Sequence, residues 1–223
     1  MNDFEKFALS RGIGSNVLDG YNKYNTKNGY IDPYVVEERA MNVTSINVFS
    51  RILMDRIIFL GSEINDDVAN IITAQLLWLE QESGSDIKIM INSPGGSIYA
   101  GYEILDCMNY INCDVSTISM GMTASMATII ASSGTKGKRF ILPHTRFLIH
   151  QPLGGTKGQC SDIQIEAKEI QTLKEELANI LAENSGLPYE RIVEMCDRDT
   201  ILTAKQTVEY GFVDKIIEKA KND

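Results

Sequence analysis

Apolar residues along the chain follow two spacings, one typical of strands and the other typical of helices. Short apolar runs at residues 56–61 and 87–92 predict buried strands. Each run precedes a longer segment, at 66–81 and 97–109, in which the apolar residues recur as on one face of an amphipathic helix. A further run, at 115–131, is rich in Ser, Thr and Gly and predicts a buried strand followed by a buried helix. Strands that alternate with helices in this way predict an α/β fold with parallel crossovers.

The ends of the predicted helices carry recognisable signals. Asp66 or Asp67 is expected to cap the first of them. The longest helical pattern runs over 161–183 and ends at Gly186, which Pro188 follows closely. Its apolar residues form one stripe, made of Ile163, Ala167, Ile170, Leu173, Leu177 and Leu181. A stripe of this length needs a packing partner.

The residue types that hydrolytic acyl transfer needs stand at the ends of predicted elements. Ser125 lies among small residues where a strand passes into a helix, and His150, one of two histidines, ends a short apolar run before a Pro/Gly turn. Further along the chain, Asp197 and Asp199 flank Arg198. Serine supplies a hydroxyl nucleophile, histidine a base that titrates near neutral pH, and aspartate a carboxylate that orients the imidazole. Only one of the two aspartates can serve the histidine, and their spacing leaves that choice open.

Each of these residues also has an ordinary structural explanation. A serine beside glycine commonly serves close packing, and short motifs match by chance. His150 alone would more often occupy a turn or the core, and Asp199 alone would more often cap a helix or carry an exposed charge. The pair Gly95-Gly96 predicts a tight turn, although a glycine can also bring its N–H close to a substrate because it has no Cβ. The wider sequence around these residues therefore decides between the two explanations.

Composition and charge narrow the class of protein. The 223 residues, 43% of them hydrophobic, suffice for one domain with a full core. A net charge of −9 argues against a nucleic-acid partner, because no basic surface is available to displace counterions from phosphates. The chain does not begin like a secretory signal, and its longest apolar run is too polar for a membrane span, so we expect a cytoplasmic protein with no membrane partner. Neither a zinc site nor a disulfide framework is expected from the four cysteines, Cys107, Cys113, Cys160 and Cys196.

Longer segments of the chain resemble, in the same order, the signature blocks of the ClpP family, the serine peptidases of the Clp proteases (peptidase family S14). These segments are INSPGGSIYAGYEILDCM, STISMGMTASMATIIASSG, GKRFILPHTRFLIHQPLGGTKGQCSDI and DRDTILTAKQTVEYGFVD. The resemblance implies an α/β fold of the ClpP/crotonase-like type, a superhelix of repeated β-β-α units with a projecting handle helix. It places a peptidase domain at 35–223, with an axial loop at about 35–47 and the handle at about 154–184. Residues 1–34, rich in Asn, Gly, Tyr and Lys, are then an N-terminal extension, either a removable propeptide or a flexible tail.

The resemblance also implies a role for each candidate catalytic residue. Ser125 would be the nucleophile, His150 the general base, and Asp199 the carboxylate that orients the histidine. The backbone N–H groups of Gly96 and Met126 would form the oxyanion hole. These roles describe a serine endopeptidase that cleaves unfolded proteins and small peptides with no metal and no cofactor of its own.

Partners are implied in the same way. Members of the family build two stacked heptameric rings, and a hexameric AAA+ Clp unfoldase, of the ClpX or ClpA/ClpC type, feeds unfolded polypeptides to them. ATP would be used by that unfoldase, because this chain has no Gly-x-x-x-x-Gly-Lys-Ser/Thr phosphate loop. Asp197 and Arg198 would contact the opposite ring, and Lys88 stands where the family commonly has an aromatic residue. The unfoldase-docking pocket is expected at Met90, Ile118, Met120, Phe140 and Leu142.

Other functional classes remain as alternatives. A crotonase-fold acyl-CoA enzyme would share the β-β-α repeat and paired backbone donors but would not require a serine, histidine and aspartate together. A non-catalytic ring subunit would be expected to have lost at least one of them. Because Ser125, His150 and Asp199 are all present, the sequence favours a peptidase that takes part in protein quality control and turnover.

Overall fold

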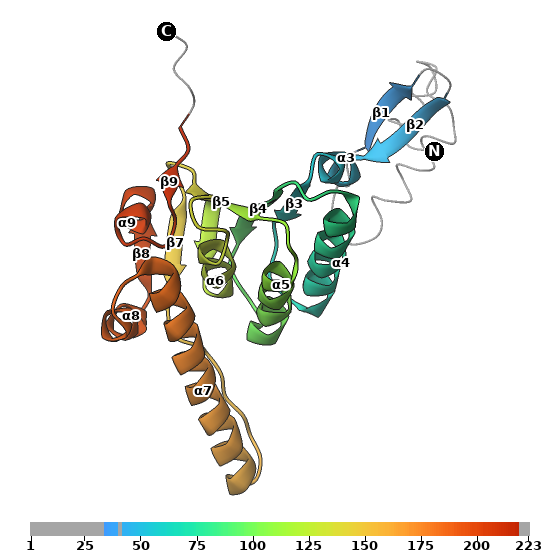
Figure 1. Ribbon diagram of the computed structural model, residues 1–223. Coiled ribbons are helices and arrows are strands. Elements are labelled where there is room, and N and C mark those ends of the chain that lie inside the picture. The colour runs from blue at the N-terminus through green and yellow to red at the C-terminus, as the bar shows by residue number, and fades with distance from the viewer. Residues whose placement is uncertain (1–33, 40–41, 219–223) are drawn as a thin grey trace, which may run out of the picture. The chain divides into compact units, whose positions relative to one another are not determined.

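The chain divides into two units between Met54 and Asp55 in the computed structural model (Figure 1). The structure describes residues 34–39 and 42–218. In the first unit, β1 (Tyr34–Arg39) pairs antiparallel with β2 (Asn42–Asn47), and α3 (Val48–Met54) follows. The segment expected to form an axial loop, about 35–47, therefore contains two paired antiparallel strands. The predicted N-terminal extension, 1–34, lies outside the described residues except for its last position.

The second unit is built around a seven-stranded sheet in which the strands run in the order β3-β4-β5-β6-β9, while β7 pairs with β5 and β8 pairs with β7. All of these pairs are parallel except β7 with β8. The predicted α/β fold with parallel crossovers is thus confirmed. The strands are β3 (Ile57–Leu60), β4 (Ile87–Ser93), β5 (Val115–Ala124), β6 (Arg139–Ile141), β7 (Arg146–Ile149), β8 (Thr200–Thr203) and β9 (Lys215–Ile216).

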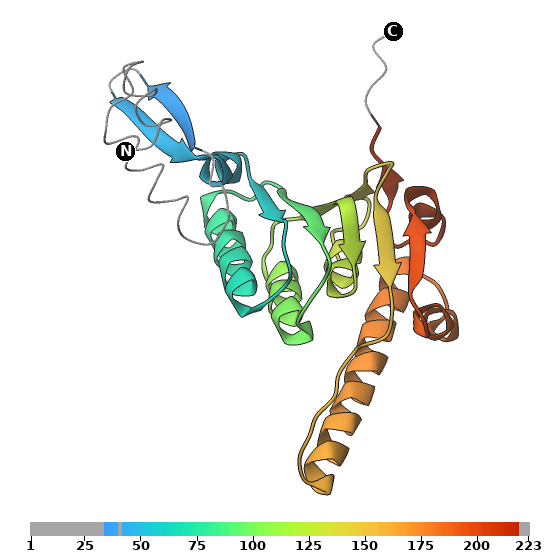
Figure 2. The same ribbon diagram turned by 180° about the vertical axis from the view of Figure 1, so that it is seen from behind.

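Three helices lie on one face of this sheet, and the opposite view shows the other face of its strands (Figures 1 and 2). They are α4 (Asp66–Glu82), α5 (Ile98–Tyr110) and α6 (Met126–Ser132). Strand β4 shows how the sequence chooses between the two faces, since Ile87, Ile89 and Ile91 are buried whereas Lys88 and Asn92 are exposed. Alternation of this kind places every second side chain against the helices.

The cap of α4 differs from the prediction. Asn65, not Asp66 or Asp67, is the N-cap residue, and its Oδ1 accepts a hydrogen bond from the Val68 N–H at 3.0 Å. A cap must stand one residue before the helical conformation begins, so its side chain can reach a free N–H of the first turn. Asp66 and Asp67 occupy that first turn, where their charges are favourable near the positive end of the helix dipole.

Strand β5 changes its neighbour halfway along its length. Its residues 117–119 pair with β6, whereas residues 122–124 pair with β7. Between them Gly121 has φ +60°, and a Cβ there would lie 2.6 Å from the Asn92 Oδ1, which accepts a hydrogen bond from the Met122 N–H at 3.1 Å. Glycine is needed at this point because the backbone is left-handed and the Asn92 side chain fills the space. The bend directs the end of β5 towards β7.

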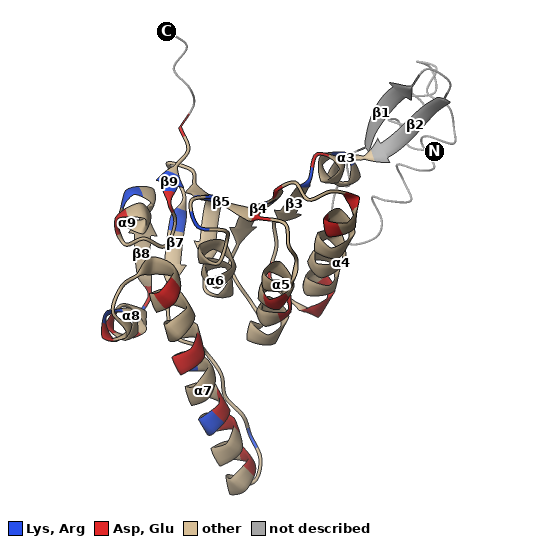
Figure 3. Ribbon diagram, in the orientation of Figure 1, with Lys and Arg blue, Asp and Glu red and all other residues tan. Residues whose placement is uncertain are grey.

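The predicted long helix is α7 (Cys160–Ser185), which agrees with the expected 161–183 within two residues at each end. In both views it extends away from the rest of the second unit, and the segment that leads into it runs alongside (Figures 1 and 2). Acidic residues recur along it (Figure 3). Two of them accept hydrogen bonds from α5: Glu169 from the Tyr99 hydroxyl at 3.0 Å and Glu176 from the Tyr102 hydroxyl at 3.1 Å. These bonds attach the middle of α7 to the body of the unit.

The remaining helices, α8 (Tyr189–Cys196) and α9 (Ala204–Glu209), follow α7 and flank β8 in the chain.

A buried arginine, Arg139, connects the C-terminal part of the chain to the sheet. Its guanidinium forms an ion pair with Asp214 at 2.6 Å and also donates to the carbonyl oxygens of Ser132 and Asn184 at 3.1 and 2.8 Å. Arg139 therefore links β6 to the C-terminal ends of α6 and α7.

Replacing Arg139 with methionine is expected to lower the free energy of unfolding by about 3 kcal/mol at pH 7, because the Asp214 carboxylate loses its paired cation and two carbonyl oxygens lose the guanidinium donor. Burial alone would raise the pKa of Asp214, but the hydrogen bonds from Arg139 outweigh it and hold that pKa below its ordinary value of 3.8. A carboxyl whose pKa is lowered by folding stabilises the protein above its unfolded-state pKa, and this contribution is lost as the pH falls through the folded-state pKa.

Urea unfolding followed by circular dichroism at several pH values would test this expectation. The difference in free energy of unfolding between wild type and Arg139→Met should be largest at pH 7 and should become smaller as the pH falls below 3.8. Arg191→Met is a matched control, because Arg191 pairs with Glu194 on the surface and its loss should change the stability by less than about 1 kcal/mol. A difference that stayed constant with pH would contradict the role given to the Arg139–Asp214 pair.

Candidate active site

The register of the sheet brings the three candidate catalytic residues to one edge. Ala124, the last residue of β5, pairs with Leu148 of β7, and Ile149 of β7 pairs with Thr200 of β8. Ser125 and His150 therefore follow the carboxyl ends of two adjacent parallel strands. Asp199 immediately precedes the antiparallel β8, so the same register continued by one residue sets it opposite His150. Residues far apart in the sequence meet here because the strands that precede or follow them are paired.

Ser125 stands between β5 and α6 in a strained backbone conformation. Its φ of 53° is positive, which is uncommon for a residue other than glycine. Hydrogen bonds hold it there: the Ser125 N–H donates to the Leu148 carbonyl at 2.9 Å, and the Ser125 carbonyl accepts from the N–H and the hydroxyl of Thr128 at 2.8 and 2.6 Å. A sharp strand-to-helix turn of this kind exposes the side chain of the residue at its apex. The sequence placed Ser125 at the start of a helix, but nothing in it signalled the strain.

His150 and Asp199 are in contact. The His150 Nδ1 lies 3.1 Å from the Asp199 Oδ1. An ionised carboxylate can only accept, so the proton of the neutral imidazole lies on Nδ1 and the Nε2 lone pair stays available as a base. Asp197 is instead 3.8 Å from the Arg198 guanidinium, and the Arg198 side chain is 92% exposed. The two aspartates thus have different partners: Asp199 contacts the histidine, and Asp197 lies near Arg198.

Gln151, which the sequence did not single out, connects the histidine to the loop that carries the aspartates. Its N–H donates to the Cys196 carbonyl at 2.7 Å, and its side-chain Nε2 donates to the Asp197 carbonyl at 2.9 Å. Both bonds are made by the residue that follows His150, and they end on residues two and three positions before Asp199. They hold the two segments at the separation that the imidazole–carboxylate contact requires.

The Gly95-Gly96 turn lies next to Ser125. Gly96 has φ +150°, and a Cβ there would lie 2.1 Å from the Ile64 carbonyl oxygen, so only glycine fits. The turn is tied down by hydrogen bonds from the Ile64 N–H to the Gly95 carbonyl and from the Ser97 N–H to the Ile64 carbonyl, both 2.8 Å long. Within residues 34–39 and 42–218, no acceptor is recorded for the N–H of Gly96 or of Met126. Both groups are therefore available to bind a negatively charged oxygen.

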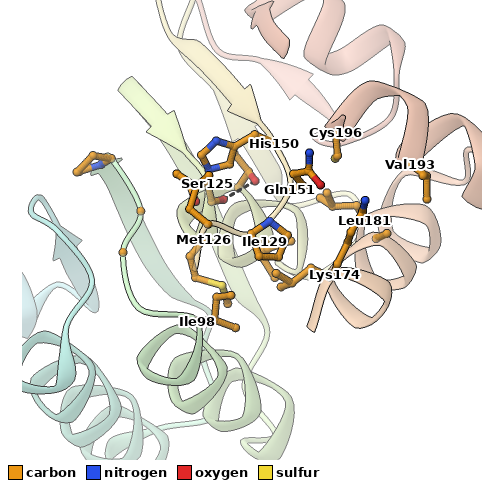
Figure 4. A pocket seen from close by; sticks show the side chains of 18 of the residues that line it. Ile98, Ser125, Met126, Ile129, His150, Gln151, Lys174, Leu181, Val193 and Cys196 are labelled. Carbon is orange, nitrogen blue, oxygen red and sulfur yellow. Dashed lines mark hydrogen bonds between the residues drawn. The ribbon is translucent and has the colours of Figure 1, made fainter. Parts of the chain in front are cut away.

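A cavity of about 480 Å³ extends from this edge to α7 and α8. Ser125, Met126 and His150 lie on one side of it, and Lys174, Val193 and Cys196 lie on the other (Figure 4). Most of the remaining wall is apolar, with Ile98, Ile129, Leu177 and Leu181 among the residues that form it. An extended peptide whose carbonyl carbon approached Ser125 could place one side chain in this cavity.

The residues expected to form a docking pocket share one face of the sheet. Met90, Ile118 and Phe140 are directly paired across β4, β5 and β6, and all three are partly exposed. Phe59 of β3 pairs with Met90 and extends the row, which the sequence did not predict. Met120 and Leu142 are also half-buried, and Lys88, two residues before Met90, is exposed. The row forms because equivalent positions of parallel strands point to the same face.

All four cysteines are free, and only Cys160 is exposed. Among the described residues, no group of three or more His, Cys, Asp and Glu side chains could hold a metal ion. None of the helices formed by those residues combines the length and the apolar character needed to cross a membrane.

Comparison with known proteins places this geometry in a family. The profile of the family described as Clp protease matches residues 39–220. The ATP-dependent Clp protease proteolytic subunit of Porphyromonas gingivalis is 52% identical over 98% of this chain and 99% of its own length, and that of Bacteroides fragilis is 51% identical over 98% and 100%. The ATP-dependent Clp protease proteolytic subunit 1 of Chlamydia felis is 48% identical over 85% and 94%. Since both the profile and these relatives span nearly the whole chain, the protein belongs to the Clp protease family.

Proposed function

We propose that Ser125, His150 and Asp199 form the catalytic triad of a serine endopeptidase that serves as the proteolytic core of an ATP-dependent Clp protease. The observation that carries this proposal is the His150–Asp199 contact of 3.1 Å, at the same sheet edge as the strained Ser125. The acyl-CoA enzyme and the non-catalytic subunit are not favoured, because the relatives are proteolytic subunits and all three residues are present.

The reaction follows from the roles of these groups. As the Ser125 Oγ attacks the carbonyl carbon of the scissile bond, its proton passes to the His150 Nε2. Asp199 stabilises the imidazolium that forms, and the N–H groups of Gly96 and Met126 bind the oxyanion of the tetrahedral intermediate. The imidazolium then gives its proton to the leaving amine, and the C–N bond breaks. Water, activated by His150, hydrolyses the acyl-enzyme and restores the Ser125 hydroxyl.

The partners form the second part of the proposal. A hexameric AAA+ Clp unfoldase docks on the sheet face that carries Met90, Ile118, Met120, Phe140 and Leu142, and delivers unfolded polypeptides. The partial exposure of this apolar row supports an apolar docking segment, and the exposed Lys88 adds a charge at its edge. ATP is hydrolysed by that partner, and small peptides are cleaved without it. Residues 1–34 are a propeptide or tail, and the protein acts in the cytoplasm.

Assembly into two stacked heptamers completes the proposal. The first ten residues of α7, from 160 to 169, are all exposed, although Ile163 and Ile165 among them are apolar. Contact with the opposite ring would bury these side chains, and it would give the exposed Asp197 and Arg198 a partner. The handle, 154–184, is therefore assigned to contacts between rings.

A fluorophosphonate probe tests the catalytic assignment directly, because it phosphonylates a serine only where a base and an oxyanion hole activate it. The purified protein should acquire one phosphonyl group, and peptide mass spectrometry should place it on Ser125. Heat-denatured protein, which retains every serine but no assembled site, is the control and should stay unlabelled. Modification of a different serine, or an active protein that the probe neither labels nor inhibits, would overturn the proposal.

A further inference from the structure

Lys174 interrupts the apolar stripe of α7. Its neighbours three and four residues away on the helix are Ile170, Gln171, Leu177 and Ala178, and none of them carries a charge. Side chains at these spacings are the ones that could form ion pairs within the helix. The lysine is also half-buried, whereas most other charged residues of α7 are exposed. A cation at this position therefore lacks the helical partners that a surface lysine usually has.

The side chain of Lys174 lines the same cavity as Ser125 and His150 and lies across the cavity from them (Figure 4). Burial raises the pKa of the neighbouring Cys196 to about 11, and the positive charge of Lys174 opposes this rise. The positive charge of Lys174 thus acts on the part of the cavity wall that Cys196 forms. Within residues 34–39 and 42–218, Lys174 has no recorded hydrogen bond or ion pair, while Lys138, for comparison, contacts both Asp86 and Asp114.

The surroundings of Lys174 within the cavity are apolar. Leu177, Ala178, Leu181 and Val193 line the wall around it. An apolar wall offers an ammonium group neither hydrogen-bond acceptors nor a counter-charge. A ligand with a negative charge would therefore stabilise the ammonium group most. The carboxylate of Glu63, which also lines the cavity, is on the loop beside the Gly95-Gly96 turn and forms no recorded ion pair with Lys174. The cavity therefore presents an unpaired cation on the α7 side of the candidate catalytic residues.

We propose that Lys174 is a specificity-determining residue that favours substrates with glutamate or aspartate immediately before the scissile bond. This inference rests on the proposed peptidase function. Because the cavity opens beside Ser125, the residue whose carbonyl Ser125 attacks is the one best placed to direct its side chain toward Lys174. Apolar side chains are still accepted along the rest of the wall. The lysine adds a second class of substrate rather than replacing the first.

A pair of fluorogenic peptides that differ only in carrying Glu or Gln before the fluorophore would isolate the effect of charge, since the two side chains have the same shape. Wild-type protein should show a ratio of kcat/KM for Glu over Gln that Lys174→Met lowers about tenfold and Lys174→Glu lowers further. The ratio in the wild type should also fall with added salt, because screening weakens a contact between charges. Lys205→Met removes an exposed lysine that lies outside both the cavity and the handle, so the ratio of this variant should match the wild type.

The outcomes separate this inference from the proposed function. If wild-type protein cleaves the Gln peptide but the Glu-to-Gln ratio is the same in Lys174→Met and wild type, the specificity role is wrong and the peptidase function stands. If neither peptide is cleaved and the fluorophosphonate leaves Ser125 unlabelled, the proposed function fails. Sedimentation velocity completes the set, because a Lys174→Met protein that fell apart into smaller oligomers would identify an assembly residue and overturn the specificity role.

Discussion

Replacing Ser125 with alanine is expected to reduce the cleavage of small fluorogenic peptides by about 10⁴-fold or more, because removal of the nucleophile leaves only oxyanion binding and substrate positioning. Folding should be unaffected. The Ser125 side chain makes no capping hydrogen bond, and the backbone bonds to Leu148 and Thr128 that hold the turn remain in the variant. Exchange of a hydroxyl for a hydrogen also opens little space.

Steady-state peptidase assays beside thermal unfolding would measure both parts of this expectation. Ser85→Ala is the matched control, since Ser85 is exposed and lies outside the cavity, and it should retain wild-type activity. A Ser125→Ala protein with near wild-type activity would remove Ser125 from the mechanism. Lost activity together with a lower melting temperature would point to a structural role for the hydroxyl instead.

Replacing Asp199 with asparagine should lower kcat by about 10³-fold while changing KM little. The amide can donate to Nδ1, which favours the wrong imidazole tautomer and places the proton where Ser125 needs a base. The Asp199 side chain is 68% exposed in the single chain, so its effect is attributed to orientation of the ring more than to a buried charge. The variant should keep its fold, because among the described residues His150 is the one recorded polar partner of the Asp199 side chain.

Asp197→Asn provides the comparison within the same loop. The Asp197 carboxylate lies near Arg198, whereas the recorded carboxylate contact of His150 is with Asp199, so this variant should stay within a few-fold of the wild-type kcat when the oligomer is intact. Sedimentation velocity on both proteins would separate loss of assembly from loss of chemistry. If Asp197→Asn were as inactive as Asp199→Asn with an unchanged sedimentation coefficient, the choice of catalytic aspartate would have to be reversed.

Much of the fold was predictable because the signals are local. The alternation on β4 and the helical spacing of α7 depend only on neighbouring residues, and the predicted bounds of α7 agree with the structure within two residues at each end. The cap of α4 was misassigned by one or two residues, since a run of Asn65, Asp66 and Asp67 offers several side chains of the same capping type. Only the backbone conformation shows which of them precedes the helix.

The sequence by itself determined the alternating strands and helices from 56 to 131, the long helix at 161–183, the junction at which Ser125 stands, and the end of the apolar run that carries His150. These follow from patterns that repeat over a few residues. The spacing of the two aspartates left their roles open and the resemblance pointed to Asp199, which the tertiary structure places at the histidine. Only the tertiary structure decided that Ser125 adopts a positive φ and that Lys174 of α7 faces the same cavity. The physical reason is that strand register and helix packing bring together segments that are far apart in the chain. The spacing of residues within one segment does not determine which distant segment will lie beside it.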